Sequence, residues 1–203
     1  PDVKNSPGGL RDLHIMQWLA IKIYHAHCNA DLCEVGLLTK SEYEEYLACR
    51  DFLWDVRFAV HCNSNSNILR LDFQKNVASL LGYGDEGNEP VESMMRDLFR
   101  IFNRVRELNN ILLQQVALNI KGYVGPNYEE PIFLTNSFVQ KGEYIDVIDH
   151  ELFKNDPHKI LDLFLTIGSH SDIKKIHVNC LRALREGRRE LSDYLITNET
   201  CRK

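Results

Sequence analysis

The residues whose types and spacing best suit a reaction lie at the start of the chain. Gly8 and Gly9 directly precede a predicted helix whose first turn carries Arg11 and Asp12. Free backbone N–H groups at a helix start can bind an anion such as phosphate, and Lys4 and Arg11 would add positive charge. Asp12 in the first turn suits the helix dipole. The alternative is a capped hinge between two domains, which the glycine and proline content favours on composition alone.

A second segment, Gly168–Asp172, looks like the Gly-Ser opening of a site for nucleotidyl transfer. That chemistry needs two carboxylates spaced D-x-D, which hold Mg²⁺ on a triphosphate. Ile173, Lys174 and Lys175 follow Asp172 instead. We therefore expect Ser171 to be the N-cap of a helix, because short motifs often match by chance.

Two metal-dependent chemistries are also disfavoured by spacing. His25, His27, Cys28 and Cys33 do not follow any usual zinc-ligand pattern. A metal-dependent phosphohydrolase would carry an adjacent His-Asp pair, and the chain has only the reversed Asp149-His150. The chain is therefore expected to hold no metal and no complete catalytic site.

The elements that must position these residues are predicted to be mainly helical. Hydrophobic periodicity predicts an antiparallel helical bundle over residues 10–118 and a smaller α+β segment over 119–203. Aromatic and β-branched residues at 138–147 predict a small β-hairpin around Gly142. The principal helices of the bundle are expected at residues 10–26, 39–61, 72–81 and 90–118.

The second of these helices has the most specific local signals. Thr39 and Glu42 form the T-x-x-E pattern of a capping box. Leu53, Trp54 and Val56 are predicted to face the interior.

Composition excludes several classes of function. The 203 residues carry a formal net charge of −5, which argues against a general nucleic-acid binder. We find neither a signal peptide nor an apolar stretch long enough to span a bilayer. Six scattered cysteines favour reduced thiols and a cytoplasmic location. Pro1 in place of Met, and a helical pattern that continues to Lys203, suggest a piece of a longer protein.

The order of several motifs resembles one known family. The segment "KNSPGGLRDL" at 4–13, "GLLT" at 36–39 followed by Glu42, and "FLWDVRFAVH" at 52–61 are similar to stretches of the bifunctional uridylyltransferase/uridylyl-removing enzymes. "GNEPVE" at 87–92 and "RELN" at 106–109 agree as well. "NILRLDFQ" at 67–74 departs from the family's pattern.

The resemblance implies a role for the chain between two catalytic domains. Residues 1–9 would continue from an absent nucleotidyltransferase core, and 119–203 would lead toward an absent hydrolase domain. The whole enzyme would transfer UMP from UTP, with Mg²⁺ held outside this chain, to a tyrosine of the nitrogen regulatory protein PII, and remove it when glutamine is plentiful. Lys4, Gly8, Gly9, Arg11 and Asp12 would lie nearest the triphosphate, with Asp12 orienting Arg11 or the loop.

Two alternatives remain open at the level of sequence. One is a helical binding module of a related nucleotidyltransferase, such as the enzyme that adenylylates glutamine synthetase. The other is a purely structural scaffold between domains, in which Lys4 and Arg11 support stability but not nucleotide binding.

Overall fold

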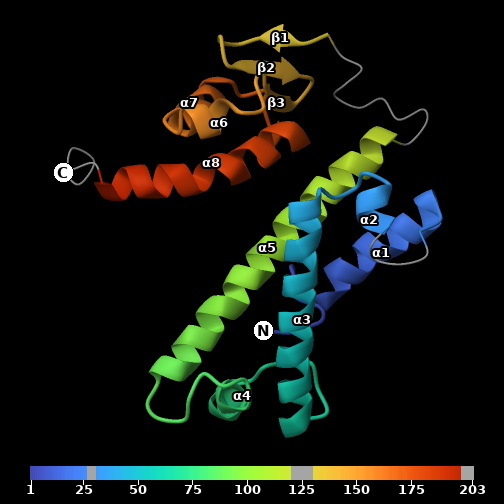
Figure 1. The fold of residues 1–203 in the computed structure, drawn as a ribbon, viewed down its shortest axis with the longest axis vertical. Coiled ribbons are helices and arrows are strands. Elements are labelled where there is room, and N and C mark those ends of the chain that lie inside the picture. The colour runs from blue at the N-terminus through green and yellow to red at the C-terminus, as the bar shows by residue number, and fades with distance from the viewer. Residues whose placement is uncertain (27–30, 120–129, 198–203) are drawn as a thin grey trace. The chain divides into compact units, whose positions relative to one another are not determined.

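The computed structural model describes residues 1–26, 31–119 and 130–197, which fall into two compact units (Figure 1). The first unit is Pro1–Val116 and the second is Ala117–Lys203. The described chain is mainly helical with one small mixed sheet, so the predicted mainly helical class is confirmed. No described helix combines the length and the apolar character that crossing a membrane requires.

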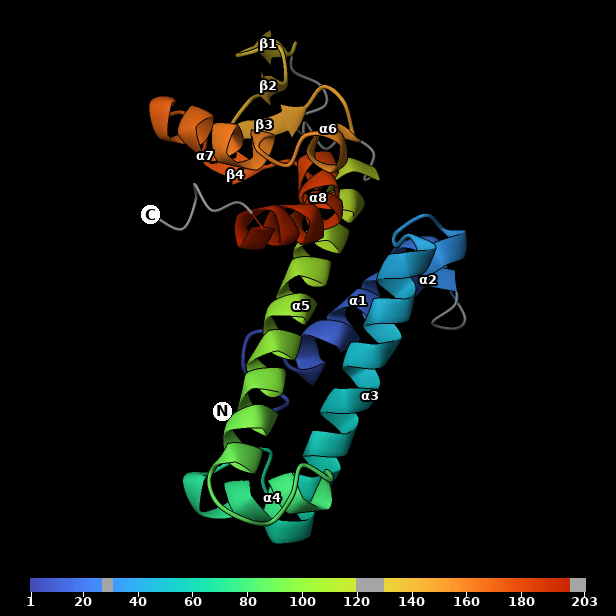
Figure 2. The ribbon, with the colours of Figure 1, turned by 60° about the vertical axis from the view of Figure 1, so that its left-hand side comes forward.

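The first unit is built from helices alone over its described residues, apart from an isolated bridge between Asp2 and Ile68. The elements in chain order are α1 (Leu10–Tyr24), α2 (Asp31–Glu34), α3 (Lys40–Asn63), the 3₁₀ turn η1 (Leu71–Phe73), α4 (Gln74–Leu80) and α5 (Glu89–Asn119). Figure 2 shows α3 and α5 side by side, with α4 near the end where α3 stops and α5 begins. The short helix α2 was not predicted. Helix α1 ends at Tyr24, two residues earlier than expected, and His25 caps it in a left-handed conformation.

The start of α3 follows the prediction from sequence. The N–H of Glu42 donates to Thr39 Oγ1 at 3.2 Å, and the N–H of Thr39 donates to Glu42 Oε2 at 2.8 Å. Both halves of the capping box are therefore present, and two N–H groups that a helix start leaves without a partner are satisfied.

The core of the first unit lies where α1, α3 and α5 meet. Fully buried apolar side chains recur at helical spacing along all three helices. They include Leu10, Leu13 and Met16 of α1, Leu53 and Val56 of α3, and Met94, Leu98, Val105, Leu108 and Leu112 of α5. Trp54 does not join them, because its side chain is 43% exposed. The prediction that Trp54 faces the interior is therefore wrong.

Over its described residues, the second unit packs three helices against a four-stranded sheet. The elements are β1 (Ile132–Phe133), β2 (Phe138–Lys141), β3 (Tyr144–Val147), α6 (Leu152–Asn155), α7 (Lys159–Ser169), β4 (Lys175–Ile176) and α8 (Val178–Thr197). The strand order is β1-β2-β3-β4, with β3 and β4 parallel and the other neighbours antiparallel. Gly142, with φ +58°, lies in the tight turn between β2 and β3, so the region predicted as a hairpin is the centre of a larger sheet.

The segment after α7 corrects the sequence prediction. Ser171 does not cap a helix, because α8 begins only at Val178. The residues just before α8 pair with β3 instead. The N–H groups of Lys174 and Lys175 donate to the carbonyl of Glu143, and that of His177 donates to the carbonyl of Ile145. Burial of Ile173 against the sheet accompanies this pairing, so tertiary contacts override the local capping signal.

Candidate functional site

The first residues of the chain form an ordered loop that is folded onto the first unit. The N–H of Val3 donates to the carbonyl of Asn67, and the N–H of Leu69 donates to the carbonyl of Pro1. Asp2 organises the turn, because its Oδ1 accepts from the N–H groups of Lys4 and Asn5 at 2.9 and 2.8 Å. Burial opposes ionisation of Asp2, but these hydrogen bonds and the Asn5 side chain hold its pKa below the ordinary value.

The two glycines of this loop are required by close packing. Gly8 has φ +87°, and a Cβ there would lie 2.1 Å from the carbonyl oxygen of Phe102 in α5. A Cβ on Gly9 would lie 2.7 Å from the carbonyl oxygen of Val3. Both glycines therefore allow the loop to pack closely against the protein's own backbone. From the sequence we had predicted that they allow a close approach to a phosphate.

The amides at the start of α1 all have internal partners. The N–H of Gly8 donates to Asp12 Oδ2 at 2.7 Å. The next four N–H groups, those of residues 9–12, donate to the carbonyls of Ser6, Val3, Lys4 and Gly9. The prediction that free amides bind an anion here is therefore wrong. Asp12 orients the loop, and the assignment of Lys4 and Arg11 to a phosphate site stays a prediction.

Beside this loop lies an exposed row of aromatic rings on α1 and α3. The His14 ring centroid is 6.0 Å from that of Trp18 and 6.5 Å from that of Trp54. The guanidinium of Arg57 lies 4.9 Å from the Trp54 ring centroid, within the range of a cation–π interaction. Trp18 is 60% exposed. With Lys4 and Arg11, these residues make up what we call the aromatic-basic face.

Lys4 and Arg11 are tied to this row by the backbone. The N–H of Arg11 donates to the carbonyl of Lys4 at 2.9 Å, and Arg11 stands one helical turn before His14. Desolvation lowers the pKa of His14, and the positive charges of Lys4, Arg57 and Arg11 lower it further. His14 therefore lies in a positive field that opposes its protonation.

Eight described cations outside this face form ion pairs, whereas others, such as Lys22, Lys75 and Arg96, have none among the described residues. Arg50, Arg70, Arg100, Arg104, Lys141, Lys154, Lys159 and Lys175 each pair with a carboxylate. Among the described residues, no carboxylate lies within ion-pair distance of Lys4, Arg11 or Arg57. In a chain of net charge −5, this concentration of uncompensated positive charge favours an external anion.

Comparison with known proteins assigns the chain to a family. Residues 1–113 match the family model described as GlnD PII-uridylyltransferase, and residues 138–203 match the model described as uridylyltransferase GlnD third domain. The chain belongs to the PII-uridylyltransferase family. This decides against membership of a different nucleotidyltransferase family and leaves the scaffold alternative open.

Several curated members of the PII-uridylyltransferase family match nearly the whole chain. A bifunctional uridylyltransferase/uridylyl-removing enzyme of Vibrio atlanticus is 40% identical over 202 residues, which is 97% of this chain and 23% of that protein. Enzymes of the same name from Photobacterium profundum and Vibrio cholerae are 40% and 38% identical, over 97% and 100% of this chain and 22% and 23% of theirs. The chain thus spans about a quarter of the length of these relatives. No solved structure matches it.

The aromatic-basic face lies within the part of the chain matched by the first of the two family models. Our sequence reasoning found Lys4 and Arg11 but missed His14, Trp18 and Arg57, and it placed Trp54 in the core. A signal for the face was present in α3, where Trp54 and Arg57 each follow a buried position by one residue, Leu53 and Val56. Two interleaved stripes on one helix indicate two faces, of which only one is core.

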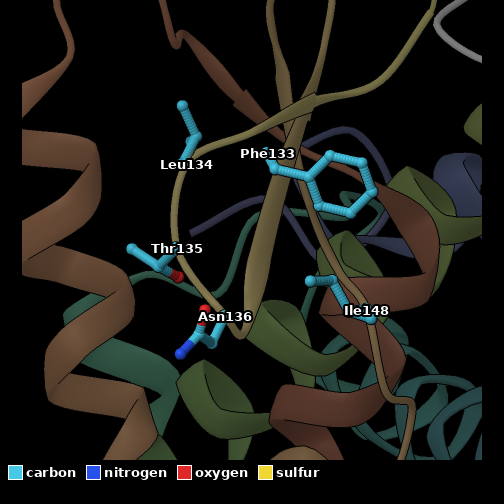
Figure 3. Close-up of a pocket in the computed structure, with 5 residues that line it drawn as sticks. All are labelled: Phe133, Leu134, Thr135, Asn136 and Ile148. Atoms are coloured by element: carbon cyan, nitrogen blue, oxygen red, sulfur yellow. The ribbon is translucent and has the colours of Figure 1, made fainter.

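An open hollow in the second unit lacks the groups that chemistry would need. It has a volume of about 510 Å³ and is lined by Phe133, Leu134, Thr135, Asn136 and Ile148 (Figure 3). Thr135 and Asn136 provide its polar side chains, and none of the five residues titrates near neutral pH. The aromatic-basic face is therefore the stronger candidate site.

Proposed function

We propose that this chain is the central, substrate-side helical part of a bifunctional uridylyltransferase/uridylyl-removing enzyme. The complete enzyme would transfer UMP from UTP to the nitrogen regulatory protein PII, and remove it in response to glutamine. Family membership supports this proposal, as does the near-complete coverage of the chain by relatives that carry this name. The sequence contains neither a D-x-D nor a His-Asp pair, so both reactions would depend on segments outside it.

The observation that carries a role in nucleotide binding is the uncompensated positive charge beside the N-terminal loop. In this proposal Lys4 and Arg11 contribute charge to the triphosphate, and Asp12 fixes the loop through the Gly8 N–H. Gly8 and Gly9 act indirectly, because they let the loop pack against α5. The amides of the helix start take no part.

Mg²⁺, which would accompany the triphosphate, does not fit the described residues. Within them, no group of three or more His, Cys, Asp or Glu side chains could hold a metal ion. The metal would stabilise charge on the phosphates from ligands elsewhere in the enzyme. The contribution of this chain is then limited to positioning and to electrostatic attraction.

The test is to replace Arg11 and Lys4 separately by alanine in the full-length enzyme. Loss of a charge-assisted contact weakens binding by roughly 1.5–3 kcal/mol, so the KM for UTP is expected to rise on the order of 10- to 100-fold. Lys40→Ala is the matched control, because Lys40 is exposed at the start of α3, fourteen residues before Trp54. An unchanged KM in both test variants would exclude the phosphate role.

The scaffold alternative has its own support in the saturated loop. The hydrogen bonds of Asp2, Gly8 and Asp12 show that this segment contributes to the folded unit whatever it binds. If scaffolding were its only role, Arg11→Ala and Lys4→Ala would lower the melting temperature of the enzyme and leave the KM for UTP unchanged. Measuring both quantities on the same variants separates the two functions.

A further inference from the structure

The aromatic rings of the aromatic-basic face have no explanation in the phosphate role of Lys4 and Arg11. Trp18 and Trp54 are the two tryptophans of the chain, and both are substantially exposed on the same face. An isolated exposed apolar residue is ordinary, whereas grouped exposed aromatics indicate a binding surface. The question is therefore which ligand combines an aromatic surface with negative charge.

The rings are held in place by contacts within the face. Arg57 covers the Trp54 ring, and its Nε–H donates to Asn67 Oδ1 at 2.8 Å, which fixes the guanidinium. Asn67 is in turn tied to the N-terminal loop through the Val3 N–H. The row from Arg57 through Trp54 and His14 to Trp18 is thus linked to the segment that carries Lys4, and this order reduces the entropy lost on binding.

The spacing along α1 matches the two ends of a nucleotide. Arg11 and Trp18 are seven residues apart, which places them on one side of the helix and roughly 10 Å apart along its axis. Along this side of α1, Arg11 therefore presents a cation at one end and Trp18 an exposed indole at the other. A nucleoside triphosphate has the same polarity, because its phosphates and its base lie at opposite ends. An acidic protein surface would pair with the cations alone, whereas this face also exposes the rings of Trp18 and Trp54.

We propose that Trp18 stacks against the base of the nucleotide whose phosphates bind Lys4 and Arg11. His14, which contacts both the Trp18 and the Trp54 rings, supports Trp18 in this position. The inference rests on the proposed function and adds the site of the base to it. Every base has a π-face, so stacking supplies affinity more than discrimination among bases. The indole of Trp18 is uncharged and 60% exposed, which suits the flat uncharged end of the ligand.

The experiment compares two ligands on the full-length enzyme by calorimetry, UTP and inorganic tripolyphosphate. Trp18→Ala is expected to weaken UTP binding roughly 5- to 100-fold, the range for loss of one stacking ring, and to leave tripolyphosphate binding unchanged. Trp18→Phe, which keeps a π-face, is expected to restore most of the UTP affinity. Phe99→Ala, which removes an exposed ring from α5, is the matched control.

The outcomes separate this inference from the function on which it rests. If Arg11→Ala weakens both ligands and Trp18→Ala weakens neither, the base site is wrong and the phosphate role stands. If neither variant changes either ligand, both are wrong. If Trp18→Ala weakens the binding of both ligands equally, the base site is overturned. It is also overturned if Trp18→Ala raises only the KM for the protein substrate PII, and in that case the face binds protein.

Discussion

Two clusters of charge, one in each unit, differ in how their charges are compensated. In the second unit, Asp146 is 1% exposed and receives Lys141 Nζ at 2.9 Å and His177 Nδ1 at 3.1 Å. In the first unit, Lys4, Arg11 and Arg57 lie around His14, and none of them has a carboxylate within ion-pair distance among the described residues. Charges that are paired and buried specify a fold, whereas charges gathered in solvent without a counterion are available to a ligand.

The same two clusters show why the strongest electrostatic interaction need not mark the functional site. Burial alone would raise the pKa of Asp146, but hydrogen bonds and charges from His177 and Lys141 lower it to about 2. Perturbed carboxylates do occur at active sites, but ion-pair networks within a fold shift pKa values in the same way. His177 Nε2 is buried without a hydrogen-bond partner among the described residues, and the residue is 1% exposed, so a substrate could not reach this cluster without rearrangement.

The largest expected effect is on stability, and it tests the buried cluster around Asp146 in the second unit. Asp146→Asn leaves Lys141 and His177 without their shared counter-charge, and breaking a buried pair in this way costs about 3–5 kcal/mol. The free energy of unfolding in urea should fall by that amount, while UTP affinity of the folded enzyme stays unchanged. Asp85→Asn, at an exposed carboxylate, is the control. A loss below about 1 kcal/mol would show that the cluster does not stabilise the unit.

The next effect concerns the loop that supports the aromatic-basic face. Gly8→Ala combines a left-handed backbone with a Cβ placed 2.1 Å from the Phe102 carbonyl oxygen, so we expect a loss of roughly 2–4 kcal/mol in unfolding free energy. Gly36→Ala is a matched control, because Gly36 has φ +74° but a Cβ there would meet no described atom within 4 Å. It should cost only about 1–2 kcal/mol. Equal losses at the two positions would mean that the contact with α5 is unimportant.

A pH titration sharpens the comparison with a smaller effect. The pKa of Asp146 is depressed in the folded state, so its contribution is fully present above the unfolded value near 3.8 and is lost as pH falls toward about 2. The loss amounts to about 2 kcal/mol between pH 5 and pH 2. The wild-type chain should lose this increment of unfolding free energy on acidification, and Asp146→Asn should not. Parallel pH profiles for the two proteins would contradict the assignment.

The smallest expected effect on stability belongs to the face itself. Trp18→Ala and Arg11→Ala remove solvent-exposed side chains, so each should change the unfolding free energy by less than about 0.5 kcal/mol. Thermal or urea unfolding of the two variants measures this. A loss of several kcal/mol in either variant would show that these side chains support the fold rather than a ligand.

Sequence reasoning succeeded where the determining interactions are local. The capping box at Thr39 involves two residues three apart, and the apolar spacing of α5 repeats within a single helix. It failed where distant segments decide the outcome. The residues after Ser171 do not start a helix because they pair with the region of Glu143 and Ile145. Trp54 is exposed because α1 and α5 bury the adjacent stripe of α3 instead.

The candidate site divides in the same way. The residue types at 4–12 identified a special loop, but not the contacts that its residues make. Asp12 accepts a hydrogen bond from the Gly8 N–H, and the Phe102 carbonyl of α5, distant in sequence, leaves no room for a Cβ at position 8. The aromatic part of the face joins two helices, and His14 and Trp54 are far apart in sequence, so no local motif contains it. Only the folded arrangement shows that the cations around it lack carboxylate partners within the described part of the chain.

The UTP affinity of the full-length Lys4→Ala/Arg11→Ala double variant, with its unfolding free energy measured alongside, tests the nucleotide role of this face most directly. We predict UTP binding weaker by at least about 100-fold, because two charge-assisted contacts are lost, and stability within about 0.5 kcal/mol of the wild type. Wild-type affinity for UTP in the folded double variant would contradict the claim that this uncompensated charge serves the nucleotide.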